Sequence, residues 1–277
     1  MGLLDFGAVA DSGVKGPYAD YDTALTALRS DVTASDGDLY QLDNDMVFNA
    51  YVSEGPGILI PSDLYDRVSA YVDNASGDAY FVAADTEAEI VARGWVVAEA
   101  NGGSVTGGNG SAFRCDSGAA SSGAPFSNAQ ITFTPSASVA SCLVIAKLQA
   151  VAGGARSDQT YAMSHFSGGS WIRVVSTSGS NGVFQIYGGS NVILAEQIGK
   201  ITDTSATWFV MYSDTSATTN VVYFRRLEDK PEESIAAEVG DLGSLAFSSV
   251  PYLRTSGTTG GSQCTIDYYE CHALETT

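Results

Sequence analysis

Carboxylates that could cleave a sugar polymer are the first candidates for chemistry. In a retaining glycoside hydrolase, the acid and the nucleophile face one bond at a separation of about 5 Å, so on one strand they must share a face. Asp267 and Glu270 lie three residues apart and face opposite sides of a predicted strand, and Glu232-Glu233 follows Pro231 in a predicted loop. The sequence also lacks Gly-x-Ser-x-Gly, Walker and His-Glu-x-x-His motifs. It therefore predicts that the chain is not an enzyme.

Aromatic side chains are the second group of candidates, because an amphipathic ring offers a sugar an apolar face and a hydrogen-bonding edge. A stacking platform could be drawn from Trp171, Tyr187, Tyr212, Tyr223, Tyr252, Tyr268 and Tyr269. The alternative for each ring is a place in the core or at an interface, and Trp208 is assigned to the core. Trp171 and Tyr252 each begin a predicted strand beside a turn with Gly, Ser or Pro, which favours a rim position. We therefore expect these two residues to contact glycans.

Metal ligands are scattered in the sequence. The four cysteines show no close paired spacing: Cys115, Cys142, Cys264 and Cys271. Buried thiols are the favoured interpretation, and disulfides are the alternative. His165 and His272 do not complete a zinc site. Asp203, Asp214 and Asn220 could hold Ca²⁺ through oxygen ligands, although turn residues of this kind are more often solvated. The prediction is no metal and no cofactor, with Ca²⁺ as the open alternative.

Charge narrows the class of partner. The 277 residues include 13 Lys and Arg against 32 Asp and Glu, which gives a net charge of -19. Such a chain repels phosphate backbones and anionic membranes, so neither nucleic acid nor a membrane is an expected partner. No stretch approaches the roughly 20 apolar residues that span a bilayer, and the first residues lack the features of a signal peptide. We expect a soluble protein that does not use the general export route.

Residues 1–100 are predicted to form a small α+β domain. Tyr21, Ala24, Leu25 and Leu28 follow the i, i+3, i+4, i+7 spacing of an amphipathic helix over 20–29. The other expected elements are a hairpin of 37–42 and 46–52, strands over 57–60, 79–83 and 95–98, and helices over 62–72 and 85–93, the last with Asp85 as its N-cap.

A linker and a β-domain are predicted to follow. Residues 101–123 are rich in Gly, Ser and Asn, which favours a flexible boundary, with a possible first strand at 112–115. Residues 124–277 contain about ten short strand candidates with almost no helical periodicity, which predicts a β-sandwich or barrel. The central feature is a hairpin over 206–227, in which Trp208, Val210 and Tyr212 share one face of a strand and Phe209 and Met211 share the other. Because both faces are apolar, we expect this strand to be central and covered on both sides.

The C-terminal half resembles the concanavalin-like, laminin G-like jelly roll. The resemblance rests on the order of Ile131-Thr-Phe, Trp208 at the start of a strand, Tyr223-Phe-Arg, Pro251-Tyr-Leu and the closing Ile266-Asp-Tyr-Tyr-Glu-Cys. Tyr268-Tyr269 stands where the family usually has small aliphatic residues. The resemblance implies a sandwich that hosts lectins, enzymes and structural modules.

The N-terminal half resembles virion proteins of tailed bacteriophages. The matching stretches are Tyr21 to Leu28, Asp36 to Asp45 and Gly94 to Val97, and Leu4 to Asp11 is similar to the entry segment of phage tailspikes. This implies a virion structural protein, assembled in the host cytoplasm and then extracellular, whose partners are capsid or tail subunits.

Two functions follow from this resemblance. One is a head-fibre, tail-fibre or decoration subunit that presents the sandwich to host-surface polysaccharide. The other is a cement protein that binds only neighbouring subunits. We also expect a trimer or higher homo-oligomer held through residues 1–98, because that unit carries more apolar strand residues than a small domain usually buries: Val47, Phe48, Tyr51, Ile58 and Ile60.

Overall fold

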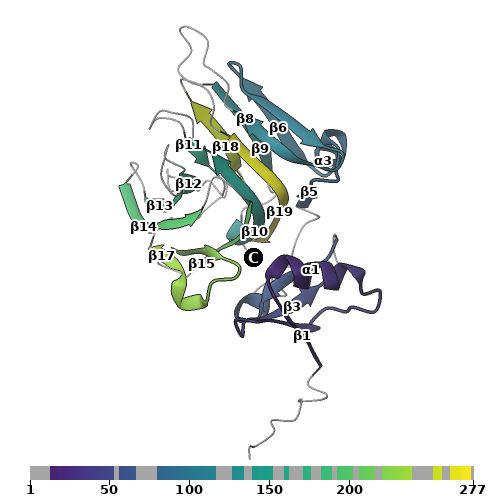
Figure 1. Cartoon of the computed structure of the whole chain (residues 1–277). Coiled ribbons are helices and arrows are strands. Elements are labelled where there is room, and N and C mark those ends of the chain that lie inside the picture. The colour runs from purple at the N-terminus through teal and green to yellow at the C-terminus, as the bar shows by residue number, and fades with distance from the viewer. Residues whose placement is uncertain are drawn as a thin grey trace, which may run out of the picture. The chain divides into compact units, whose positions relative to one another are not determined.

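The computed structural model forms two compact units, Met1–Arg67 and Val68–Thr277. It describes residues 13–52, 56–66, 80–116, 127–133, 139–151, 159–161, 171–175, 182–188, 192–201, 206–215, 220–238, 252–257 and 263–275 (Figure 1). The tailspike-like segment Leu4 to Asp11 lies outside these residues, as does the end of the helix predicted over 62–72, which is helical from Ser62 to Asp66.

In the first unit, the helix over residues 21–30 packs on a four-stranded sheet. The sheet has the order β1-β2-β3-β4, with β1 parallel to β2 and the other neighbours antiparallel. The elements are β1 (Val14–Tyr18), α1 (Tyr21–Ser30), β2 (Leu39–Leu42), β3 (Val47–Tyr51) and β4 (Ile58–Pro61). The helix and the hairpin predicted for this stretch are thus confirmed.

Helix α1 forms where its sequence pattern predicts. The Asp20 side chain caps the N-terminus by accepting a hydrogen bond from the Thr23 amide at 2.8 Å. Tyr21, Ala24, Leu25 and Leu28 are buried along one face. The Tyr21 hydroxyl donates to the carbonyl of Leu59 at 2.8 Å and accepts from the Leu59 amide at 3.3 Å, so the helix is fixed to β4.

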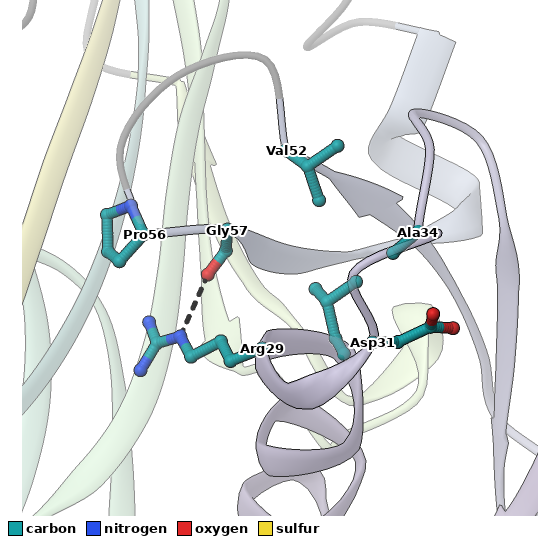
Figure 2. Close-up of a pocket in the computed structure, with 7 residues that line it drawn as sticks. Arg29, Asp31, Ala34, Val52, Pro56 and Gly57 are labelled. Carbon is teal, nitrogen blue, oxygen red and sulfur yellow. Dashed lines mark hydrogen bonds between the residues drawn. The ribbon is translucent and has the colours of Figure 1, made fainter.

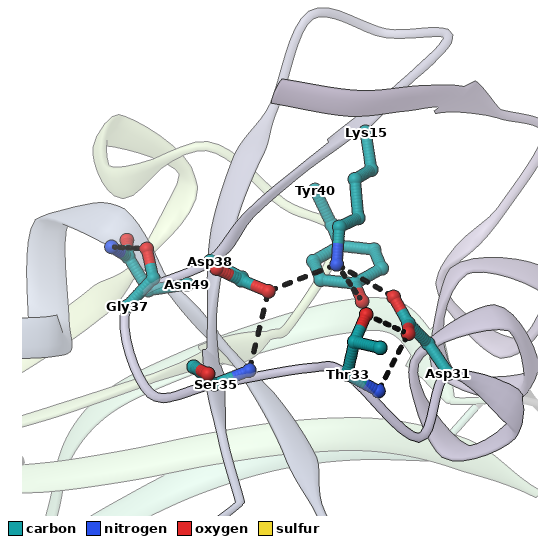
Figure 3. Close-up of polar contacts among 8 residues, drawn as sticks. All are labelled: Lys15, Asp31, Thr33, Ser35, Gly37, Asp38, Tyr40 and Asn49. Carbon is teal, nitrogen blue, oxygen red and sulfur yellow. Dashed lines mark hydrogen bonds and ion pairs between the residues drawn. The ribbon is translucent and has the colours of Figure 1, made fainter. Parts of the chain in front are cut away.

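A charged cluster that the sequence did not indicate ties β1 to the rest of this unit (Figure 3). The Lys15 ammonium donates to Asp31 at 2.7 Å, to Asp38 at 2.9 Å and to the Tyr40 hydroxyl at 3.3 Å. Asp31 is the C-cap residue of α1. Hydrogen bonding to Lys15 holds the pKa of both carboxyls below their usual range, and the two carboxylates raise the pKa of Lys15.

The apolar strand residues chosen for the oligomer contact are mostly enclosed. Phe48, Ile58 and Ile60 are at most 1% exposed, and Tyr51 is 4% exposed. Only Val47 is half-buried. The homo-oligomer stays a prediction. Four of the five side chains named for it are already buried within the described structure, so they do not need a partner chain to cover them.

The second unit is a β-sandwich. Among the described residues, its first sheet has eight strands. Seven of them lie side by side in the order β17 (Ile235–Glu238), β16 (Asn220–Arg226), β15 (Thr207–Thr215), β10 (Val139–Val151), β19 (Gln263–Glu275), β8 (Ser111–Asp116) and β7 (Ser104–Gly108). The eighth, β5 (Tyr80–Val82), also pairs with β19. A 3-10 turn, η2 (Pro231–Glu233), joins β16 to β17.

The second sheet of the sandwich has seven strands among the described residues. Their order is β14 (Val192–Ile201), β13 (Gly182–Gly188), β12 (Trp171–Val175), β11 (Gln159–Tyr161), β18 (Tyr252–Gly257), β9 (Ser127–Phe133) and β6 (Trp95–Ala100). Helix α3 (Glu87–Ala92) precedes β6. The prediction of a mainly β protein, with a jelly-roll sandwich after a small α+β domain, is confirmed.

Aromatic rings join the two sheets in the core. Trp95 of the seven-stranded sheet contacts Phe81 and Tyr269 of the eight-stranded sheet, with ring centroids 4.8 and 5.9 Å apart. Phe81 also meets Phe113 edge-on at 5.5 Å. All four rings are at most 1% exposed. The face of the eight-stranded sheet that carries Phe81, Phe113 and Tyr269 is therefore its inner face.

The sandwich begins earlier than the sequence predicted. Strand β6 pairs with β9 along its whole length, β5 pairs with β19, and β8 also pairs with β19. These contacts place residues 80–116 in the second unit, so the predicted domain boundary at residue 100 is wrong. The cap of α3 also differs. Thr86 is the N-cap in a capping box with Glu89, while Asp85 accepts a hydrogen bond from the Val82 amide at 2.7 Å.

The Gly-rich stretch is a hairpin rather than a linker over its described part, 101–116. Strands β7 and β8 pair across it. Gly107 has a φ of +108°, and a Cβ there would lie 2.2 Å from the Ala112 carbonyl oxygen. Gly108 has a φ of +77°, and a Cβ would lie 2.5 Å from the Asp85 carbonyl oxygen. These glycines are required by backbone geometry, which composition alone could not distinguish from flexibility.

Candidate functional site

The predicted hairpin over 206–227 supplies the centre of the candidate site. Strand β15 lies between β10 and β16, and Trp208 to Met211 are all buried, so the prediction of a central strand covered on both sides is confirmed. Phe209 pairs with Ala146, and Ala146 pairs with Tyr269, which belongs to the inner face. Because neighbours along a strand alternate, Trp208 lies on the opposite face. It is buried as expected, but it is not between the two sheets.

We call this opposite side the outer face of the eight-stranded sheet. Residues that lie directly opposite each other on neighbouring strands share a face of the sheet. Three rows across the strands belong to the outer face: Tyr268, Lys147 and Trp208; Glu270, Ile145, Val210 and Arg225; and Tyr212 with Tyr223. The polar and aromatic residues of the outer face are Lys147, Trp208, Tyr212, Tyr223, Arg225, Tyr268 and Glu270.

One group on the outer face combines two rings, a carboxylate and an ammonium. The rings of Trp208 and Tyr268 have centroids 5.3 Å apart and are tilted by 48°. The Lys147 ammonium lies over the Trp208 ring, 5.7 Å from its centroid. The Tyr268 hydroxyl donates a short hydrogen bond to Glu270. Trp208, Tyr268 and Glu270 are only 6%, 4% and 5% exposed, so their polar atoms are held in a partly dehydrated setting.

A second group lies farther along the same strands. Tyr212 and Tyr223 stack with centroids 4.7 Å apart and an angle of 8° between the ring planes, and both are half-buried. Arg225, on the next row, is 1% exposed and donates to the carbonyl of Asp229 at 3.2 Å. Asp229 also accepts two hydrogen bonds from Arg226, which raise the pKa of that guanidinium.

Together, these groups can recognise an amphipathic polar ligand. Rings offer apolar faces, the tyrosine hydroxyls donate and accept hydrogen bonds, and Lys147, Arg225 and Glu270 supply charge of both signs. Pyranose rings have this dual character, with C–H faces and hydroxyl edges. The sequence identified Tyr212, Tyr223 and Tyr268 as candidate platform residues, but it did not show that Trp208, Lys147, Arg225 and Glu270 share their face. The two-residue alternation along each strand shows which residues of that strand share a face. It does not show which of the two faces points to the core, nor which strands are neighbours.

The two glycan-contact residues expected from the sequence lie in the other sheet. Trp171 begins β12 and Tyr252 begins β18, with β11 between these strands. Val174 and Thr255 both pair with Thr160, so each aromatic residue is three positions before this shared row. Their backbones thus lie at the same end of the sheet, about 10 Å apart across two strand spacings. Their side chains are outside the described part of the structure, so the glycan contact stays a prediction.

The candidate metal ligands are not brought together within the described residues, where no group of three or more His, Cys, Asp or Glu side chains could hold a metal ion. Asp203 lies outside those residues. Asp214 and Asn220 occupy the ends of β15 and β16, where Asp214 pairs with Val221 and Thr215 pairs with Asn220. Calcium binding here stays an untested alternative. In the described structure, no helix is long and apolar enough to cross a membrane.

A small pocket in the first unit is a weaker candidate (Figure 2). It has a volume of about 220 Å³ and is lined by Leu28, Arg29, Asp31, Ala34, Val52, Pro56 and Gly57. Arg29 donates to the carbonyl of Gly57 at 3.1 Å across it, and Asp31 is paired with Lys15. Both charged side chains of the lining therefore already hold the fold together.

Comparisons with known proteins place the chain only by its type of fold. No family model matches the sequence, and no curated protein matches it. Among solved structures, a Bacillus subtilis protein of unknown function with a galectin-like fold is similar at 7% identity and a TM-score of 0.48, covering 73% of this chain and 99% of that one. An endo-1,3-beta-glucanase from Streptomyces sioyaensis has 12% identity and a TM-score of 0.47, covering 73% and 97%. Peanut lectin has 14% identity and a TM-score of 0.44, covering 73% and 100%.

These neighbours correct one prediction from the sequence. They include a glucanase as well as a lectin, so sandwiches of this kind occur in both enzymes and binding proteins. The prediction that the chain is not an enzyme is contradicted by this finding. The sequence lacks the strand motif with two carboxylates on one face, and this excludes one known arrangement of a catalytic site. It does not exclude enzymes as a class.

Proposed function

We propose that this chain is a structural protein of a tailed-bacteriophage particle and that its sandwich binds carbohydrate through the outer face of the eight-stranded sheet. The first unit, Met1–Arg67, would attach the chain to the particle, and the second, Val68–Thr277, would carry the binding face.

The observation that carries the carbohydrate part is the clustering on one face of Trp208 with Tyr268 and of Tyr212 with Tyr223. Lys147 and Glu270 contact the first of these ring pairs. A sugar that packs its C–H groups on the exposed part of a tyrosine ring would find hydroxyl, carboxylate and ammonium groups on the same face of the sheet. Tyr212 and Tyr223, which are half-buried, are the rings best placed to make such contacts.

The virion part is supported by the sequence resemblance over Tyr21 to Leu28 and Asp36 to Asp45. In the structure, Tyr21 to Leu28 lies in α1, and Asp36 to Asp45 contains β2 and the turn that leads to β3, so both stretches belong to one compact unit. The third matching stretch, Gly94 to Val97, belongs to the sandwich, where Trp95 fills the core. It therefore supports the fold of the second unit and not the attachment.

The cement function is the alternative, and the composition of the outer face favours it as well. Trp, Tyr and Arg are the residues that most often dominate the binding energy of protein–protein interfaces. Trp208, Tyr223 and Arg225 could serve a neighbouring virion subunit as well as a sugar.

A glycan array tests the carbohydrate assignment. The full chain should bind at least one class of bacterial surface polysaccharide, and Tyr223→Ala should lower the affinity roughly fivefold, because a ring contact contributes about 1 kcal/mol. Tyr18→Ala is the matched control, since Tyr18 is a half-buried tyrosine of the first unit that stacks on Tyr40 at 6.0 Å. Equal binding by both variants would reject the outer face as the site.

Purified particles test the virion assignment separately. Mass spectrometry of particles from the source culture should detect the chain in constant ratio to the major shell protein, and antibodies against the chain should label intact particles. Particles that lack the chain would reject the virion role and leave the carbohydrate result standing.

A further inference from the structure

Two of the four cysteines meet across neighbouring strands. Strands β8 and β19 pair in antiparallel register without a shift, and Cys115 lies directly opposite Cys264. The adjacent pairs, Asp116 with Gln263 and Arg114 with Thr265, fix this register on both sides. The two cysteines are 149 positions apart in the sequence, which is why spacing gave no sign of them.

The strand geometry at this position suits a disulfide. Directly opposite residues of an antiparallel pair have Cα atoms about 4.5 or 5.5 Å apart, depending on their place in the hydrogen-bond ladder. Disulfides join Cα atoms that are about 4.4–6.8 Å apart. Either place in the ladder therefore brings the two Cα atoms within the range of a disulfide.

The other two cysteines provide a natural comparison. Strand β10 pairs with β19 so that Cys142 lies opposite Ala273, while Cys271 lies opposite Val144. Cys142 and Cys271 are thus diagonal neighbours, and such Cα atoms are about 7–8 Å apart. This exceeds the reach of an unstrained disulfide.

We propose that Cys115 and Cys264 form a cross-strand disulfide when the chain enters an oxidising medium. With a small-molecule disulfide such as glutathione disulfide as oxidant, the thiolate of one cysteine attacks a sulfur of that disulfide and releases one glutathione. The thiolate of the second cysteine then attacks the mixed disulfide and releases the other. Two protein thiols are oxidised, one glutathione disulfide is reduced to two glutathione thiols, and the protons of the protein thiols end on the glutathione sulfurs.

The bond would lock the sandwich after folding in a reducing compartment. Cys115 is a fully buried thiol, so oxidation requires the β7–β8 hairpin to open at the edge of the sheet and is slow in the native state. Once formed, the bond closes a loop of about 150 residues, and such long loops are where cross-links restrict the unfolded chain most. Oxidised protein should therefore melt on the order of 10 °C higher than reduced protein.

The test is peptide mapping of the full chain. Reduced protein is incubated with glutathione disulfide, alkylated under denaturing conditions and digested without reductant. The expected product is a peptide pair linked through Cys115 and Cys264, with Cys142 and Cys271 alkylated. Recovery of Cys115 and Cys264 as alkylated thiols, or of either one linked to another cysteine, would overturn the proposal.

Melting curves supply a second readout. Dithiothreitol should lower the melting temperature of the oxidised wild-type chain and of a Cys271→Ala control. It should leave the melting temperature of Cys264→Ala unchanged. A reductant effect that survives in Cys264→Ala would overturn the proposal. If Cys264→Ala fails to fold, the map of the wild-type chain still decides the question.

Discussion

Trp95 offers the most direct test of where the sandwich begins. Its ring is 1% exposed and packs edge-on against Phe81 and Tyr269, so Trp95→Ala removes a large side chain from between the two sheets. Replacing a buried Trp by Ala typically costs about 3–5 kcal/mol. With a urea m-value of about 3 kcal/mol/M, this loss lowers the midpoint of the affected transition by roughly 1–1.7 M.

The assay is urea unfolding of the full chain followed by circular dichroism, with two reference variants that identify each transition. Leu28→Ala removes a buried side chain of α1 and marks the first unit, while Phe209→Ala marks the sandwich. Trp95→Ala should shift the same transition as Phe209→Ala. A shift of the Leu28→Ala transition instead would show that residues 80–116 belong to the first unit, and it would refute the boundary at residue 67.

Three further predictions concern local features. Gly107→Ala should destabilise the sandwich by at least about 2 kcal/mol more than Gly110→Ala, because a Cβ at position 107 would clash with the Ala112 carbonyl, while a Cβ at position 110 meets nothing within 4 Å. Equal melting temperatures for the two variants would contradict this. Tyr21→Phe should lower the free energy of unfolding of the first unit by about 1–3 kcal/mol, because the buried Leu59 carbonyl and amide lose their hydrogen-bond partner. An unchanged urea midpoint would show that these hydrogen bonds do not stabilise the unit. Lys15→Met should destabilise the first unit near pH 7, where Lys15 and both carboxylates are charged in the folded wild-type protein. Because the pKa of each carboxyl is lower in the folded than in the unfolded chain, the unfolded chain takes up protons first as the pH falls below about 4, and the difference from wild type should shrink toward pH 2. A difference that is constant down to pH 2 would contradict the ionic origin.

Local pattern was enough to predict much of the fold. Helix α1 follows from its apolar spacing, and the hairpin of β15 and β16 follows from two β-branched and aromatic runs around a polar turn. Alternation along β15 also predicted which residues share a face. These features depend on neighbours within a few residues, and the sequence displays those directly.

Long-range pairing could not be predicted in the same way. The Gly-rich stretch was interpreted as a linker because glycine density is also typical of flexible chain. Instead, Gly107 and Gly108 lie in the β7–β8 hairpin, where their backbones come close to the carbonyl oxygens of Ala112 and Asp85. The partnership of Lys15 with Asp31 and Asp38 has no sequence spacing that would reveal it.

The same limit applied to the candidate site. Trp208, Lys147 and Tyr268 share the outer face because three strands from distant segments lie side by side. No property of the separate segments predicts that order of strands.

Particle adsorption tests the central claim most directly. Particles that carry Tyr223→Ala should adsorb poorly to host cells while keeping their resistance to heat, whereas particles that carry Tyr18→Ala should adsorb as wild type does. Normal adsorption by Tyr223→Ala particles that break more easily than wild type would contradict carbohydrate binding and support the cement function.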